Sequence, residues 1–143
     1  MTSIVEYMTR QHRFCDDSFA AAEAAVSENN WREAGTQWDV FSRDLEVHLT
    51  NEEQTLFPLF EKVSGNADGP TSVMRMEHQQ MRGMVEAMTK ALQAKDIEDY
   101  LGLSETLMIL MQQHNMKEEQ ILYPMTQQML PDTAEVISSM NDL

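Results

Sequence analysis

The chain carries the sequence HLTNEEQTLFP at residues 48–58 and a second copy of the same motif, HNMKEEQILYP, at residues 114–124. The two copies share six of eleven positions, and a Phe in the first corresponds to a Tyr in the second. The same offset of 66 residues relates the remaining two histidines, His12 and His78. The sequence therefore predicts two similar helical hairpins, each with one His on its first helix and His-x-x-x-Glu on its second.

Four segments space their apolar residues by three and four positions, which places these side chains on one stripe of a helix. The composition agrees, because the 143 residues include 13 Met but only 5 Gly and 4 Pro. We expect one all-α domain over residues 1–143, an antiparallel up-down-up-down four-helix bundle with helices of roughly 25 residues. The four stripes are Val5, Met8, His12, Cys15, Phe19, Ala22 and Val26; Trp38, Phe41, Leu45, His48, Glu52, Leu56 and Leu59; Met74, His78, Met81, Val85, Met88 and Leu92; and Leu103, Leu107, Leu110, His114, Glu118, Ile121 and Met125.

Helix starts are marked by capping sequences. Residues 3–6 and 30–33 have the Ser/Asn-x-x-Glu form that satisfies the free N–H groups of a helix terminus. Pro70 or Thr71 is expected to open the third helix after a turn-rich linker. Asp-x-x-Glu at residues 132–135 predicts a short C-terminal helix, which we expect to serve in packing or as a homodimer surface.

Each copy of the repeated motif ends in a proline within a predicted helix. Pro58 and Pro124 lack a backbone donor and clash with the carbonyl groups four residues earlier, at Gln54 and Gln120. A kink or a helix end is therefore predicted at both prolines.

The charge of the chain excludes two classes of partner. Asp and Glu number 24 against 10 Lys and Arg, a formal net charge of −14, so the field repels nucleic acid and anionic membranes. The longest apolar run, residues 107–111, is far shorter than the ~20 residues of a membrane span, and residues 1–13 do not resemble a signal peptide. We expect a soluble, cytoplasmic protein.

The single Cys15 excludes an internal disulfide and is expected to be a buried, unreactive thiol.

The repeat predicts a metal site in the core. With pseudo-two-fold packing, the hairpins bring four imidazoles and two carboxylates to one level, and His and Glu at i and i+4 share a helix face. A lone His or Glu on an apolar stripe is more commonly a hydrogen-bonded core residue. Here no Lys or Arg lies on the four stripes, so unpaired buried carboxylates would be strongly destabilising. The predicted metal ligands are His12, His48, Glu52, His78, His114 and Glu118.

The predicted donor set favours two ions. Nitrogen and oxygen donors without thiolate suit iron, manganese or zinc. Six ligands exceed what one tetrahedral zinc takes, whereas two metals can each take two imidazoles with both glutamates bridging. With an added solvent bridge each metal is five-coordinate, and one coordination position stays open for a small molecule. The predicted set has fewer carboxylates than a ferritin-type site. Its histidine-rich shell should therefore favour the reduced state of the metal ions.

The order of these residues resembles the hemerythrin-like, or HHE cation-binding, domain. One His and then His-x-x-x-Glu, repeated once, with Leu-Phe-Pro or Leu-Tyr-Pro after each acidic pair, extends over about residues 4–128. The resemblance implies a di-iron centre with an oxo or hydroxo bridge. It places the two histidines of each hairpin on one iron and makes the two glutamates bridging ligands.

One position departs from the hemerythrins that carry oxygen. They have a second histidine one turn after the third-helix His, where this chain has Arg82, which cannot act as a ligand while protonated. Similarity to the iron-sensing F-box ligase instead implies a module that binds or senses dioxygen, nitric oxide, peroxide or iron itself. The alternatives are an enzyme of the same fold, for peroxide or nitric oxide detoxification or iron-centre repair, and a structural bundle with zinc or no metal.

Residues beside the predicted ligands have two interpretations each. Glu53 and Glu119 are expected to be solvated or to lie behind the ligands, or one of them closes an open iron position. Arg82 and its repeat equivalent Asp16 flank the stripe at the surface, or gate a small anion. Tyr123 is expected to pack over the cluster, where it could supply a proton.

Overall fold

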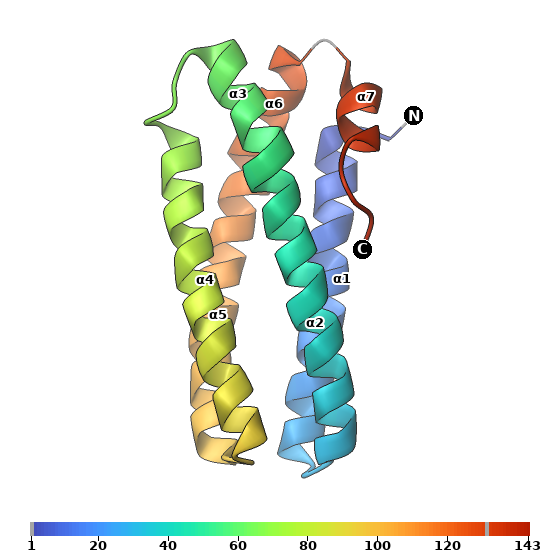
Figure 1. Ribbon diagram of the computed structural model, residues 1–143, viewed down its shortest axis with the longest axis vertical. Coiled ribbons are helices and arrows are strands. Elements are labelled where there is room, and N and C mark those ends of the chain that lie inside the picture. The colour runs from blue at the N-terminus through green and yellow to red at the C-terminus, as the bar shows by residue number, and fades with distance from the viewer. Residues whose placement is uncertain (1, 131) are drawn as a thin grey trace.

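The computed structural model describes residues 2–130 and 132–143 and shows an all-α bundle. Four long helical arms run antiparallel as two hairpins, and a short helix lies beside one end (Figure 1). The predicted four-helix bundle with a short C-terminal helix is confirmed. Within the described residues no helix is both long and apolar enough to cross a membrane. The arms are α1 (Ile4–Ser27); α2 (Trp31–Asn51), the π-helix η1 (Glu52–Leu56) and α3 (Phe57–Ser64); α4 (Pro70–Gln93); and α5 (Ile97–Lys117), the π-helix η2 (Glu118–Leu122) and α6 (Tyr123–Met129); the short helix is α7 (Thr133–Ser138).

The two hairpins pack against each other along their length. In the first, α1 packs on α2, and in the second, α4 packs on α5. Across the bundle, α1 contacts α5 and α6, while α2 contacts α4. The turns within the hairpins lie at the end opposite α3 and α6 (Figure 1), and each contains one residue with positive φ, Asn29 at 59° and Lys95 at 55°. These residues are also 66 positions apart, so the repeat extends to the turns.

The predicted caps are present. The side chains of Ser3, Asn30 and Asp132 each accept a hydrogen bond from the backbone N–H three residues later, at 3.0–3.2 Å. Pro70 is the first residue of α4, where its missing N–H costs nothing.

Both internal prolines follow a π-helix. The backbone N–H of Phe57 donates to the carbonyl of Glu52, and that of Tyr123 donates to the carbonyl of Glu118, five residues back in each case. A wide turn of this kind adds one residue to the helix, and the chain then continues through the proline instead of ending there. The second and fourth arms are therefore longer than predicted.

The added residue changes which side chains enter the core. Ile121 and Met125 were expected on the core stripe, and this was wrong, because they are 55% and 40% exposed. Leu122, Tyr123 and Thr126 are buried in their place. A constant spacing of three and four cannot continue across a turn that holds one extra residue.

A layer of buried polar side chains divides the core. One apolar cluster, around Trp38, Phe41 and Tyr100, fills the half nearer the hairpin turns. The other, around Phe57 and Phe60, fills the half beneath α3, α6 and α7. The layer between them holds the six predicted ligands, so the bundle positions these side chains between two water-excluding regions.

The change of register can be tested by a pair of alanine substitutions. Leu122→Ala should reduce the free energy of unfolding by about 2–5 kcal/mol, because it leaves a cavity under a 2% exposed side chain. Ile121→Ala should change it by less than about 0.5 kcal/mol, because that side chain is at the surface. Denaturant unfolding measures both values. An equal loss for the two variants would contradict the π-helix at this position.

Candidate metal centre

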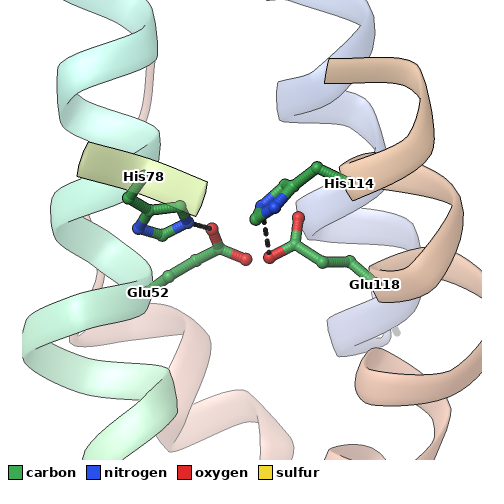
Figure 2. A group of neighbouring side chains, drawn as sticks. All are labelled: Glu52, His78, His114 and Glu118. Carbon is green, nitrogen blue, oxygen red and sulfur yellow. Dashed lines mark ion pairs between the residues drawn. The ribbon is translucent and has the colours of Figure 1, made fainter. Parts of the chain in front are cut away.

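The structure brings all six predicted ligands together. The imidazoles come from four different helices, and the two glutamates are the first residues of η1 and η2. Every one of the six is at most 4% exposed. Figure 2 shows four of them directed toward a common space between the arms. The histidines are His12 on α1, His48 on α2, His78 on α4 and His114 on α5; the glutamates are Glu52 and Glu118.

Each carboxylate reaches imidazoles of both hairpins. Glu52 Oε1 lies 3.1 Å from Nε2 of His78 and 3.4 Å from Nε2 of His48. Glu118 also contacts one imidazole of each hairpin. Its Oε1 lies 3.0 Å from Nε2 of His12, and its Oε2 lies 3.3 Å from Nε2 of His114. The two glutamates therefore connect the hairpins at the centre of the polar layer.

Several of these atoms have no hydrogen-bond partner among the described residues. They are Nε2 of His48, His78 and His114, together with Glu52 Oε1 and Glu118 Oε2. A buried acceptor without a donor is costly, and here several face the same space. A bound cation would satisfy all of them at once, so the donor atoms fit a metal.

The donor atoms form two adjacent groups. Within each group the possible ligand atoms all lie within 4.8 Å of one another. Glu118 belongs to both groups, which suits a carboxylate shared by two ions. The groups are Glu52, His78, His114 and Glu118, and His12, His48 and Glu118.

Glu53 and Glu119 lie behind imidazoles of the opposite hairpin. The Nδ1–H group of His78 donates to Glu53 Oε2, and that of His12 donates to Glu119 Oε2, both at 2.7 Å. With Nδ1 held in this bond, each ring presents Nε2 to the centre. The two carboxylates therefore orient the rings from outside.

The other two imidazoles are held by a pair of residues that the sequence reasoning missed. Nδ1–H of His48 donates to Gln11 Oε1 and Nδ1–H of His114 donates to Glu77 Oε1, both at 2.8 Å. Gln11 and Glu77 are 66 positions apart. Applying the repeat offset to the residues that precede the first-helix histidines would have found them.

Two cations lie behind the second-hairpin imidazoles. Arg82 donates to both oxygens of Glu53, at 2.8 and 3.0 Å, and also binds Glu46. Lys117 Nζ lies 2.5 Å from Glu77. Although partial burial opposes it, these cations and the adjacent imidazoles lower the pKa of Glu53 and of Glu77. Arg82 thus supports an outer carboxylate and supplies no ligand to the centre.

The equivalent positions on the other side carry no cation. Asp16 stands in the place of Arg82, and burial together with the nearby Glu119 raises its pKa. Asn51 stands in the place of Lys117, and its amide donates to the carbonyl of Asn141 at 2.8 Å. The two halves of the centre therefore share their inner residues and differ in the charge behind them.

In the absence of a metal, protons must neutralise the cluster. Burial opposes a charge on His12, but its hydrogen bonds to Glu118 and Glu119 outweigh this and raise its pKa to about 9. Burial and the Glu118 carboxylate also raise the pKa of Glu52. Metal uptake would displace such protons, as is general for buried histidine and carboxylate ligands.

Tyr123 packs over the cluster, as expected. Its hydroxyl lies 2.7 Å from Glu52 Oε2, 2.9 Å from Glu118 Oε1 and 3.1 Å from His12 Nε2. Burial and the charges of the two glutamates raise its pKa.

Cys15 is buried in the apolar cluster nearer the hairpin turns. Burial raises the pKa of its thiol to about 12, so the thiol is protonated at neutral pH. This agrees with the expectation of an unreactive core residue.

Comparison with known proteins gives a family for this site. The model of the hemerythrin HHE cation binding domain matches residues 3–126. The chain therefore belongs to this family. Searches of curated proteins and of solved structures found no match. The buried His and Glu cluster lies within the matched region and fits the cation site that the family description names.

Glu53→Ala tests whether the outer carboxylate orients a ligand or is one. The variant should keep the full metal stoichiometry at saturation while its affinity falls about 10- to 100-fold, because His78 loses its partner. Metal titration monitored by competition with a chelator measures both quantities. Glu46→Ala is the control, since it removes the other partner of Arg82 without touching an imidazole. Loss of one ion from Glu53→Ala at saturating metal would make Glu53 a ligand.

Proposed function

We propose that this member of the hemerythrin HHE cation-binding family holds two iron ions and binds or senses a small ligand with them. The observation that supports this is the set of buried, unpartnered donor atoms that face one space from two symmetric hairpins. The ligand is dioxygen, nitric oxide or peroxide, or iron occupancy is itself the signal. One iron takes His12 and His48, the other takes His78 and His114, and Glu52 and Glu118 bridge them.

The donor set supports a pair of iron ions. Four imidazole nitrogens and two carboxylates suit iron, and the one thiol in the chain is protonated in an apolar cluster. Glu118 lies in both donor groups, which a single ion would not require. When bound, a diferrous pair supplies electrons and an open coordination position to a small ligand.

The surroundings of the centre favour a small ligand over an organic substrate. All six donors are at most 4% exposed, and apolar clusters cover the layer above and below. The four outer partners fix the imidazole rings, so little reorganisation is needed when a ligand enters. Metal binding also stabilises the fold, which gives iron loss a direct effect on the population of folded protein.

Protein purified without added metal should contain two iron ions per chain by elemental analysis. His48→Ala and Glu118→Ala should each lose metal and lower the unfolding temperature, because the remaining buried charges lack compensation. Glu105→Ala, an exposed carboxylate on α5, is the control and should change neither quantity. Unchanged metal in both core variants, or stoichiometric zinc in the wild type, would contradict the proposal.

The diferrous protein should respond to one of the three small ligands under anaerobic titration. We expect a change in the optical spectrum that saturates at a fixed stoichiometry and then persists, because a binding module holds its ligand. Continuous consumption of peroxide or nitric oxide would instead identify the enzyme of the same fold. No response to dioxygen, nitric oxide or peroxide would leave iron sensing as the only surviving form of the proposal.

A further inference from the structure

The two halves of the centre carry the same aromatic ring, and only one ring bears a hydroxyl. Tyr123 stacks on His12 with ring centroids 5.6 Å apart and planes at 30°. Its repeat equivalent, Phe57, stacks on His78 at 5.5 Å and 26°. Packing on the imidazole therefore needs no oxygen, and the Tyr123 hydroxyl must be explained separately.

The hydroxyl has more acceptors around it than it can satisfy. It lies 2.7–3.1 Å from Glu52 Oε2, Glu118 Oε1 and His12 Nε2. One hydroxyl proton cannot serve both carboxylate oxygens, Glu52 Oε2 and Glu118 Oε1. At least one of them requires positive charge from another source.

The spacing of these atoms is that of donors on one ion. Adjacent donors at about 2.1 Å from a metal lie roughly 3 Å apart. The Tyr123 oxygen is at this distance from a nitrogen and two carboxylate oxygens, and its side chain is fully buried. Its lone pairs can be shared with the same cation.

The π-helix explains how Tyr123 reaches this position. A residue five positions after another lies about 140° away around a regular α-helix. In η2 the backbone N–H of Tyr123 bonds to the carbonyl of Glu118, so the wide turn places the two residues on the same face. The same turn in η1 places Phe57 after Glu52, where no hydroxyl is present.

We propose that the Tyr123 oxygen is a seventh metal ligand, bound as phenolate to the ion held by His12 and His48. This rests on the proposed di-iron centre. On metal uptake the O–H bond breaks, the proton leaves to solvent, and the oxygen donates the retained electron pair to the cation. The ion beside Phe57 has no such ligand, so the two ions are chemically different.

Visible absorption and resonance Raman spectra of the iron-loaded, oxidised protein test the assignment. The wild type should show a phenolate-to-ferric charge-transfer band with tyrosinate vibrations. Tyr123→Phe should lose both and keep two irons per chain, since Phe57 shows that a phenyl ring fits. Tyr100→Phe is the control and should keep the band, because that buried hydroxyl has no hydrogen-bond partner in the described part of the chain and lies in the other apolar cluster.

A second variant covers the case in which Tyr123→Phe does not fold. The chain has three tyrosines, so Tyr7→Phe combined with Tyr100→Phe leaves Tyr123 alone. Ring-deuterated tyrosine should then shift the tyrosinate vibrations. A wild type with two irons but no tyrosine-dependent band overturns the seventh ligand and leaves the di-iron centre intact. A wild type that binds no iron defeats the proposed function itself.

Discussion

Two carboxylates are buried among four imidazoles at the middle of the bundle, and their charge must be compensated there. Glu52 and Glu118 are fully buried, and one oxygen of each has no hydrogen-bond donor among the described residues. Isolated charges in a protein core are strongly unfavourable, so the bundle requires either protons or a cation at this level. The apolar clusters above and below exclude the water that would otherwise solvate the charges of this layer. Stability and cation binding are consequently the same property of the fold.

The internal repeat extends well beyond the six central residues. Gln11 and Glu77 hold one pair of imidazoles in equivalent ways, and each hairpin turn uses one residue with positive φ. The opposite half of the bundle follows the same rule. Trp38 donates its indole N–H to Thr89, and the equivalents of these two residues, Ser104 and Glu23, form the corresponding bond. A repeated hairpin thus explains both the centre and the polar contacts far from it.

Much of this arrangement was predictable from the sequence, and the errors in the core stripe have one physical origin. The repeat offset located all four histidines, and i,i+4 spacing placed each glutamate on the face of its histidine. The pattern failed after Glu118, where Ile121 and Met125 are exposed, because hydrophobic periodicity assumes a constant helical pitch. A π-turn at the glutamate adds one residue and moves Tyr123 into the centre. The proline in each motif indicated a disturbance without revealing its form. Outer partners such as Glu77 come from other helices, so only the symmetry could have identified them.

The charge behind the imidazoles shows how a duplicated site becomes unequal. Three rings donate to carboxylates, whereas His48 donates to the amide of Gln11. An imidazole whose Nδ1–H is bonded to a carboxylate is more basic, and so a stronger metal ligand, than one bonded to an amide. Arg82 and Lys117 moderate this on the second-hairpin side by pairing with the carboxylates there, and the first-hairpin side has no such cation at the equivalent positions. The six central donors are therefore nearly the same in the two halves, while the residues behind them differ in charge. In the proposed di-iron centre, this makes the two ions unequal without any change in the six central donors.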